Sequence, residues 1–474
     1  MTCVLHRNLR DLPILASTTG GTIKDTDSNI YLDACGGAAV SFFGHANRRL
    51  MEAAIRQLQS LDYVHTSFFT NSAYEQLAQK LTEASRGVFS RALCLSGGSE
   101  AVEVALKIAR QYFVEKGEVQ RSRFITRRQS YHGNTIGALS VGSDVKRRHD
   151  FRPLLVDVST ISECNFYRHG LVGESEEQYA MRAARELDAE LSTQPPGTVI
   201  GSIAETIVGA TAGALTPPKR YFQEISRICE THGVLLILDE IMCGMGRSGK
   251  LFAFEWENVR PDIATCGKAL GGGIQPVSAV LLSDKIVDAI QVGSGSLKGG
   301  HTFMGHPVGC SVALEALAIL TEDGFLEDVI AKGRVLEMML KQAFSSHPHV
   351  GDIRGRGLFW AIELVSDRTT KEPFPADARL NELIKRNAFT RGLLIYPGGG
   401  TVDGTVGDHI LLAPSATADA TELHEIVDRL SLAVDAGLKA ANSRIDQWLL
   451  TEGRSLLGED ESCEYSAETY GAKR

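Results

Sequence analysis

Short apolar runs alternate with helix-like segments between residues 91 and 282. Residues 99–113 and 221–233 are helix-like, and residues 234–241, VLLILDEI, are almost wholly apolar. Strands that are apolar on both faces are typical of parallel sheets covered by helices on each side. The alternation therefore predicts an α/β fold with a mostly parallel sheet flanked by helices. The other apolar runs cover residues 91–98, 122–133, 197–209, 261–273 and 275–283.

The pattern changes after about residue 325, where long helical stretches and strand-like runs follow each other without βα repeats. One of these runs, VGDIRGRGLFWAIEL, covers residues 350–364. We expect residues 61–325 to form a large domain and residues 326–444 to form a smaller α+β domain. Residues 1–60 contain a hairpin-like stretch and are expected to pack with the small domain, because terminal segments often lie together. Residues 445–474 are polar and acid-rich, which predicts a disordered tail.

Composition narrows the classes of protein. The formal charge of the 474 residues is −9, and no basic stripe is present, which argues against nucleic acid as a partner. No run reaches the about 20 apolar residues of a membrane helix, and the N-terminus has no continuous apolar core of a secretory signal. We expect a cytoplasmic protein, with Arg7 and Arg10 giving weak support for a mitochondrial alternative.

The nine cysteines are scattered without CxxC spacing. An odd, scattered set is typical of reduced intracellular thiols rather than disulfides or a metal site, so we expect no bound metal. Cys243 and Cys266 are interpreted as small core residues rather than nucleophiles.

Polar residues and glycines follow five of the predicted strands: Gly97–Ser99, Tyr131–Gly133, Glu205, Asp239 and Lys268. In parallel α/β sheets, ligands bind beyond the carboxyl ends of the strands. The five positions together predict a ligand site at this edge.

Each of these positions has a functional and a structural interpretation. Gly97–Ser99 begins a helix and could hold a phosphate, although many strand–helix turns are glycine-rich. The absence of a lysine after the glycines disfavours a triphosphate. Asp239 follows an apolar strand and needs a partner, which could be a pyridinium nitrogen, the next turn or Arg247. Its neighbour Glu240 is interpreted as structural.

Lys268 lies in TCGKALGGG, where small neighbours leave room for a ligand, although most lysines are on the surface. Tyr131 could stack on a flat ring or occupy a plain turn. His132 could be a base but is more typical of a structural, hydrogen-bonded histidine. A ligand with a phosphate, a cationic aromatic ring and an aldehyde accounts for all of these features. We therefore predict pyridoxal 5′-phosphate (PLP), with Lys268 as its Schiff-base lysine.

The chain resembles the class-III aminotransferases, the ornithine/ω-amino-acid type of PLP enzyme with fold type I. The resemblance runs from about residue 18 to about 440, and the combination Asp-Glu, Gly-x-Gly-Arg and Lys is highly specific. The matching segments are YLDACGGAAVSFFGH, LSGGSEAVEVALKIAR, YHGNTIGALS, LLILDEIMCGMGRSGKLFAFE, PDIATCGKALGGGIQPVSAV, GGHTFMGHPVGCSVALEAL and RGRGLFWAIEL.

The resemblance implies how the cofactor would be held. Gly98 and Ser99 would bind its phosphate, and Tyr131 and Ile241 would stack on the two faces of its ring. Thr302 would reach the phosphate from the neighbouring subunit, which implies a homodimer with shared active sites.

Further roles follow from the same resemblance. Asp239 would pair with the pyridine nitrogen, and Lys268 would shuttle a proton between the substrate carbon and the cofactor. Glu205 would lie on the substrate side, and His132 is grouped with the cofactor-binding residues.

Three positions near the cofactor depart from the family pattern. Gly97 stands where serine is usual, and Thr206 stands where proline is common. Met242 stands where many members have a glutamine near O3′ of the cofactor.

The sequence says less about the substrate. Residues 408–419, DHILLAPSATAD, contain no arginine that could bind a substrate carboxylate there. Two aromatic pairs suggest an apolar wall to the pocket, although two of the four phenylalanines could belong to the core. These candidates are Phe42, Phe43, Phe68 and Phe69.

The implied activity is transfer of an amino group from a primary amine or amino acid to a 2-oxo acid or other carbonyl, by a ping-pong scheme. The alternative is another PLP reaction on this scaffold, such as that of a decarboxylase, aminomutase, racemase or phospho-lyase. A non-enzymatic binding role is disfavoured because Lys268 is present.

Overall fold

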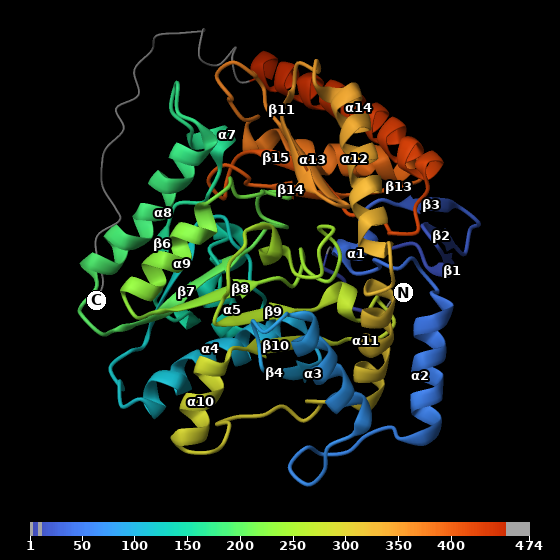
Figure 1. The fold of residues 1–474 in the computed structure, drawn as a ribbon. Coiled ribbons are helices and arrows are strands. Elements are labelled where there is room, and N and C mark those ends of the chain that lie inside the picture. The colour runs from blue at the N-terminus through green and yellow to red at the C-terminus, as the bar shows by residue number, and fades with distance from the viewer. Residues whose placement is uncertain (1–2, 8–11, 452–474) are drawn as a thin grey trace.

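A seven-stranded sheet forms the centre of the large domain (Figure 1). The computed structural model describes residues 3–7 and 12–451. The strand order is β4-β10-β9-β8-β7-β5-β6, and β10 alone runs antiparallel to its neighbours in this sheet. The predicted mostly parallel sheet is therefore confirmed. The strands are β4 (Arg91–Leu95), β5 (Arg123–Arg127), β6 (Ser159–Ile161), β7 (Val199–Glu205), β8 (Leu235–Asp239), β9 (Ile263–Cys266) and β10 (Ser278–Leu282).

Successive residues of the central strands pack into two different cores, one on each face of the sheet. In β8, Leu235 and Ile237 join the core under α4, whereas Leu236 and Leu238 join the core under α8 and α9. Side chains alternate along a strand, so a strand with helices on both faces must be apolar throughout. Helix α2 (Arg48–Ser60) belongs to the N-terminal segment that was expected to pack with the small domain, and it contacts α11. The helices that follow are α3 (Ser72–Ala84), α4 (Gly98–Glu115), α5 (Ile136–Val141), α6 (Val145–Arg148), α7 (Phe166–His169), α8 (Glu176–Thr193), α9 (Tyr221–Thr231), α10 (Asp284–Val292) and α11 (Pro307–Leu320).

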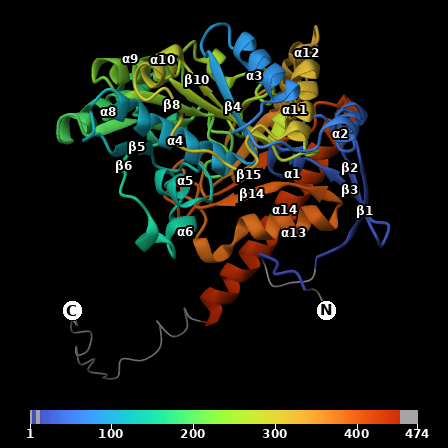
Figure 2. The same ribbon diagram turned by 90° about the horizontal axis from the view of Figure 1, so that it is seen from below.

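The C-terminal part contains an antiparallel sheet of order β11-β12-β15-β14. The single strand-like run expected at residues 350–364 is a hairpin, because Gly357 takes a positive φ of 59° between its two strands. Helices α13 and α14 lie side by side (Figure 2). The elements are α12 (Phe325–Phe344), β11 (Val350–Arg356), β12 (Phe359–Leu364), α13 (Leu380–Thr390), β14 (Tyr396–Gly399), β15 (Asp408–Leu412) and α14 (Ala420–Thr451).

The N-terminal hairpin forms a second small sheet of order β1-β2-β3-β13. Strand β3 pairs in parallel with β13, which lies next to α13 in the chain. The expected domain boundaries stay predictions. Helix α14 continues through Thr451 where a disordered tail was expected from residue 445, and residues 452–474 lie outside the described part. The remaining elements are β1 (Leu15–Thr19), β2 (Thr22–Asp25), β3 (Ile30–Asp33), the left-handed turn α1 (Gly36–Ala39) and β13 (Leu393–Leu394).

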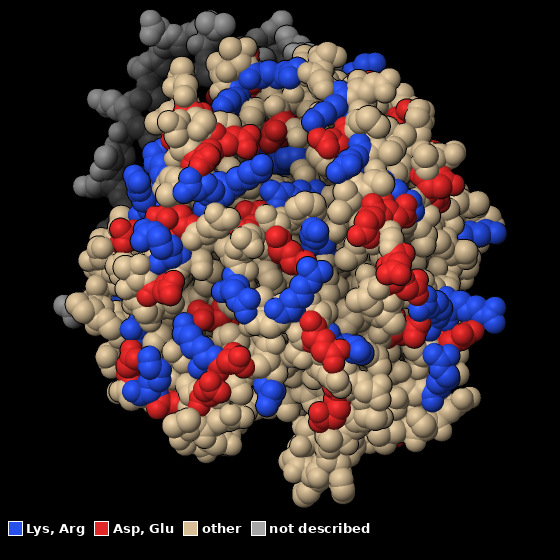
Figure 3. Space-filling model, viewed as in Figure 1, with Lys and Arg blue, Asp and Glu red and all other residues tan. Residues whose placement is uncertain are grey.

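Two further observations concern the surface and the thiols. Lys and Arg side chains are interspersed with Asp and Glu over the face seen in Figure 3. Within the described residues, no helix is long and apolar enough to cross a membrane. The cysteines in this part of the chain are free, and Cys243 and Cys266 are buried in the hydrophobic cores.

Candidate active site

The candidate residues meet at the carboxyl ends of three adjacent parallel strands. Glu205 and Asp239 pair across β7 and β8, and Asp239 pairs with Thr265 across β8 and β9. Lys268 follows two residues after β9 and takes a left-handed φ of 47°. A positive φ is uncommon for lysine and costs free energy, and such strained residues cluster at functional sites.

The Asp239 carboxylate is buried and fixed by three donors or partners. Its Oδ2 lies 2.7 Å from Nδ1 of His132. Its Oδ1 accepts from the backbone N–H of Ile241 at 2.9 Å and from the hydroxyl of Thr265 at 3.3 Å. Asp239 therefore does cap the turn that follows β8, one of its expected structural interpretations.

The other structural interpretation, an ion pair with Arg247, is wrong. The Arg247 guanidinium is fully buried and donates to the carbonyl oxygens of Leu358 and Pro414. Its ring partner is Phe42, whose centroid lies 4.5 Å away. Burial lowers the pKa of Arg247 to about 9. Arg247 therefore joins the large domain to the small one, and the side chain that binds Asp239 is His132 instead.

Lys268 has the properties of a lysine that can form an imine. Its Nζ makes no hydrogen bond with another described residue. Burial lowers the pKa of Lys268 to about 8, against the opposing charges of Asp239 and Glu205. A lowered pKa increases the fraction of neutral, nucleophilic amine near neutral pH.

Glu205 is buried, and its carboxylate is held by two backbone N–H groups. Oε2 accepts from Tyr131 at 3.1 Å, and Oε1 accepts from Gly209 at 3.0 Å. Burial raises the pKa of Glu205. These bonds anchor the loop that carries Tyr131, whose ring is partly buried beside the guanidinium of Arg147.

The N-terminus of α4 completes the arrangement. The first-turn N–H groups of Gly98 and Ser99 have no intrahelical acceptor. A Cβ at Gly98 would lie 2.9 Å from Ile241, whereas a Cβ at Gly97 would meet no atom within 4 Å. The Ser99 hydroxyl accepts from the N–H of Asn134 at 3.0 Å. The helix end therefore faces open space on one side and Ile241 on the other.

These residues fit PLP. The helix terminus suits a phosphate, the fixed carboxylate of Asp239 suits a pyridinium nitrogen, and Lys268 suits an aldehyde. Glycine at position 98 is required by the close approach of Ile241, so the cradle has no room for a side chain there. No group of three or more His, Cys, Asp or Glu side chains placed to hold a metal occurs within the described residues.

The fold and the site define a PLP-dependent enzyme of fold type I. The family model "Aminotransferase class-III" matches residues 6–434. The chain therefore belongs to the class-III aminotransferases and is an enzyme that transfers amino groups with PLP as its cofactor.

Known proteins resemble it over most of its length. An uncharacterised aminotransferase of Schizosaccharomyces pombe is 39% identical over 429 residues, which cover 90% of this chain and 94% of the relative. An aminotransferase structure from Bacillus anthracis has a TM-score of 0.85 and 32% identity, covering 91% of this chain and 96% of the other. The PMP-bound aminotransferase of Vibrio fluvialis has a TM-score of 0.84 and 29% identity, covering 91% and 94%.

Some expected residues do not meet at this cluster. Phe42 and Phe43 are core residues with 0% and 3% exposure, so they do not form a pocket wall. Phe68 and Phe69 are 80% and 69% exposed. Thr302 is exposed, and its carbonyl oxygen accepts from the hydroxyl of Tyr63 at 2.9 Å.

Two of the residues that depart from the family pattern, Thr206 and Met242, have defined contacts in the structure. The Thr206 hydroxyl donates to Glu240 at 2.7 Å, and Glu240 also accepts from the N–H groups of Ala253 and Phe254. Burial raises the pKa of Glu240 to about 7. Met242 is buried against Gly209, where an added Cβ would lie 2.3 Å from its sulfur.

Sequence reasoning missed Thr265 and Arg147. Thr265 was visible as a polar residue in an apolar strand, three positions before Lys268. Arg147 lies in the basic run 146–148, but nothing local indicates that its side chain covers Tyr131, 16 residues earlier in the chain.

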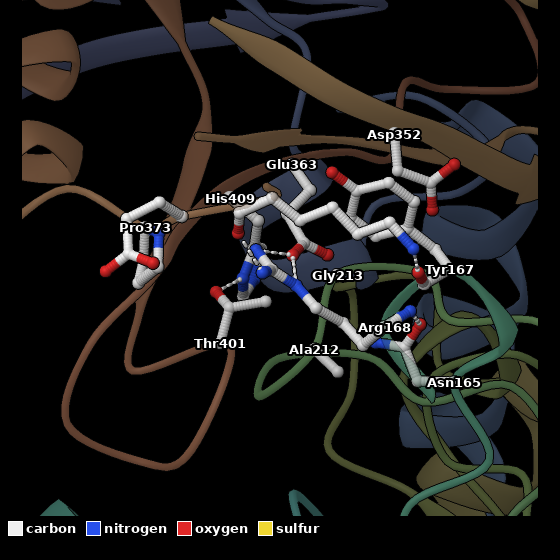
Figure 4. A network of polar contacts seen from close by, with 12 residues as sticks. Asn165, Tyr167, Arg168, Ala212, Gly213, Asp352, Glu363, Pro373, Thr401 and His409 are labelled. Carbon is white, nitrogen blue, oxygen red and sulfur yellow. Dashed lines mark hydrogen bonds and ion pairs between the residues drawn. The ribbon is translucent and has the colours of Figure 1, made fainter. Parts of the chain in front are cut away.

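A second buried polar cluster joins the two domains away from this site (Figure 4). Glu363 of β12 is bound by Arg168 at 2.6 Å and by Arg354 at 2.6 Å. Arg354 also binds Asp352 at 2.7 Å and donates to the carbonyl oxygen of Gly213 at 2.8 Å. Because Arg168 belongs to α7 and Gly213 to a loop of the large domain, the cluster fixes that domain against the small sheet.

Proposed function

We propose that this enzyme takes the amino group from a primary amine or amino acid and passes it to a 2-oxo acid or other carbonyl acceptor, in two half-reactions. Bound PLP supplies an aldehyde for the amine and a protonated ring that withdraws electrons from the substrate carbon. Lys268 holds the cofactor at rest, removes the proton from the substrate carbon and returns it on the cofactor side. Asp239 keeps the ring nitrogen protonated.

The observation that carries this proposal is the position of Lys268, just after β9, next to the end of β8, where Asp239 is bound to His132. His132 Nδ1 and two further donors fix the Asp239 carboxylate, so it needs no reorganisation to meet a cationic ring. The lowered pKa of Lys268 makes the amine available as a nucleophile and a base.

The remaining site residues would bind and orient the cofactor. In this proposal, Gly98 and Ser99 bind the phosphate, and Tyr131 and Ile241 enclose the ring between them. The close approach of Gly98 to Ile241 supports this assignment, because it brings the phosphate cradle next to one ring face. Glu205 holds the Tyr131 loop on the substrate side.

We propose a homodimer whose active sites are shared, with Thr302 reaching the phosphate in the neighbouring subunit. Thr302 is exposed and belongs to a surface rich in exposed aromatic rings, which favours contact with another chain. Tyr63 and Phe303 are in ring contact there, with centroids 5.8 Å apart. Phe303 is 55% exposed, and Phe68 lies on the same loop as Tyr63.

The state of the cysteines bears on the cellular compartment of the enzyme, and the relatives bear on its reaction class. The free cysteines support a reducing compartment, which we propose to be the cytoplasm, with the mitochondrion as the alternative. Decarboxylation, racemisation and the other PLP reactions are not favoured, because the relatives compared above are aminotransferases.

The decisive experiment mixes the PLP-loaded enzyme with a panel of amine donors and no acceptor. We expect one equivalent of carbonyl product and of pyridoxamine 5′-phosphate per site for at least one donor. Addition of a 2-oxo acid should then restore PLP. Donor consumption with release of CO₂, or without a carbonyl product, would contradict amino-group transfer.

A further inference from the structure

Arg147 is a cation beside the cofactor site whose hydrogen-bonding capacity is largely unused. It lies in α6, and its guanidinium carbon is 4.4 Å from the centroid of the Tyr131 ring. Its side chain is 40% exposed, and its Nε donates to Asp144 at 3.0 Å. Its Nη1 and Nη2 donate no hydrogen bond to any described residue.

The position of Arg147 is fixed from both domains. Val145 packs against the loop at residues 400–407, where a Cβ at Gly404 would lie 2.6 Å from its side chain. The Gln129 side chain, two residues before Tyr131, donates to the carbonyl oxygen of Gly400 at 2.7 Å. Helix α6 is therefore held between the Tyr131 loop and the small domain.

Two arginines, Arg147 and Arg7, act by their charge on Tyr131, on which Asp239 acts with the opposite sign. Burial raises the pKa of Tyr131, and the charges of Arg147 and Arg7 act in the opposite direction. The pKa of Arg147 is raised, because Tyr396, Asp144 and Tyr131 together outweigh the effect of burial. An anion that entered beside Tyr131 would meet a guanidinium that stays charged at any working pH.

Three buried arginines near the site already have partners. Arg127 donates to the carbonyl oxygen of Glu205 and lies over the rings of Tyr221 and Phe222. Arg247 donates to the backbone carbonyl oxygens that join the domains, and Arg354 is bound to two carboxylates. Residues 408–419 contain no arginine at all.

We propose that the two free nitrogens of the Arg147 guanidinium bind the carboxylate of the substrate, and that the enzyme therefore prefers amino acids and oxo acids over uncharged amines and aldehydes. This inference rests on the proposed function. The planar fork of a guanidinium binds a carboxylate through two parallel hydrogen bonds. The Tyr131 ring contacts one face of the Arg147 guanidinium, and the edge that carries Nη1 and Nη2 stays available for the ligand.

The test compares matched substrates on the PLP-loaded wild-type enzyme and on Arg147→Met. The pair is a straight-chain ω-amino acid and the primary amine of the same length without the carboxylate. We expect Arg147→Met to lower kcat/KM for the amino acid by about 10- to 100-fold, mostly through KM. The value for the uncharged amine should change less than about twofold.

Binding provides a readout that does not depend on turnover. A straight-chain carboxylic acid without an amino group is titrated into the enzyme, and the absorbance of the bound cofactor is followed. Its Kd should rise by a similar factor in Arg147→Met and by less in Arg147→Lys, which keeps the charge but loses the fork. Lys146→Met removes an exposed charge from the same helix and should leave both measurements unchanged.

The outcomes separate the two proposals. Equal losses for the amino acid and the amine in Arg147→Met would mean that Arg147 only positions Tyr131, and the carboxylate role would be overturned. Wild-type enzyme that converts amines without any preference for a carboxylate would also overturn it, while leaving the proposed function intact. If no donor yields a carbonyl product, the proposed function itself fails.

Discussion

Two buried carboxylates of this protein, Asp239 and Glu363, have very different partners. Glu363 has a guanidinium on each carboxylate oxygen, from Arg168 and Arg354. Asp239 has a histidine on one oxygen and a backbone N–H and a hydroxyl on the other. Lys268 acts on Asp239 through its charge alone and forms no hydrogen bond with it.

The two clusters differ in what their charged groups can still bind. A buried charge whose partners are complete is held tightly and has nothing left to bind. In the Asp239 cluster, Nε2 of His132 is buried without a partner and Nζ of Lys268 remains available. An unpartnered Nε2 does not separate the two clusters, because Nε2 of His409 at the domain junction is also buried without a partner among the described residues. The Asp239 cluster differs in having an amine, Nζ of Lys268, that makes no hydrogen bond with another described residue, and we therefore assign the chemistry to the strand ends rather than to the domain junction.

Replacing the lysine should give the largest effect on activity. We expect Lys268→Ala to lower kcat by at least about 10³-fold, because it removes both the cofactor link and the base. Thermal unfolding of the apoenzyme should not shift to lower temperature, since a cation is removed from a buried site. Lys285→Ala, which removes an exposed lysine paired with Asp262, should leave activity unchanged. Retention of more than a tenth of the activity would contradict the assignment of Lys268.

Breaking the other cluster should give the opposite result. Glu363→Gln removes the counter-ion of the buried Arg168 and one of the two carboxylates bound to Arg354, which we expect to cost about 3–5 kcal/mol in the free energy of unfolding. The activity of each remaining folded site should stay close to that of the wild type. Denaturant unfolding and active-site titration measure the two quantities. Glu177→Gln, at an exposed ion pair with Arg220, should cost no more than about 1 kcal/mol. Equal costs for the two variants would show that burial does not distinguish them.

The pKa of Lys268 predicts how the apoenzyme depends on pH. Because the folded value of about 8 lies below the ordinary 10.5, the unfolded chain binds more protons between these values. Stability should therefore rise with pH from about 8 to about 10.5, by up to about 3 kcal/mol. The rate of covalent PLP attachment should also rise as the pH passes about 8, because the neutral amine is the nucleophile. Lys268→Ala should lack the stability change. A flat stability profile in the wild type would refute the lowered pKa.

Among the described residues, Nε2 of His132 and Nε2 of His409 are buried without a hydrogen-bond partner, and the two histidines therefore make a matched pair for mutation. His132→Asn should weaken PLP binding by about tenfold and change the absorbance of the bound cofactor, because Asp239 loses its support. His409 is bonded to Thr401 at 2.7 Å at the domain junction, and burial lowers its pKa to about 3. His409→Asn should alter the unfolding free energy and leave the cofactor absorbance unchanged. A change in cofactor absorbance in both variants would mean that the clusters are coupled.

Much of the fold could be predicted from the sequence, because helix and strand periodicity is local. The run VLLILDEI gave β8 and its burial on both faces, and the glycine-rich turn before Ser99 gave the start of α4. Two other features of the fold were not predicted from the sequence. The run at residues 350–364 was expected as one strand, but Gly357 turns it into a hairpin. The aromatic pair Phe42 and Phe43 was indistinguishable from a pocket wall until its burial was known.

The residue types at the strand ends, and therefore the chemistry that they can perform, can be inferred from the sequence alone. A lysine among glycines, an aspartate after a buried strand and glycines before a helix all follow from short stretches. Tertiary structure decided which of them touch. His132 supports Asp239 across 107 residues, and Arg147 covers Tyr131 from α6, whose Val145 lies against Gly404 of the small domain. Local patterns fix which face of an element is buried, whereas such pairings depend on how distant segments pack once the sheet has formed.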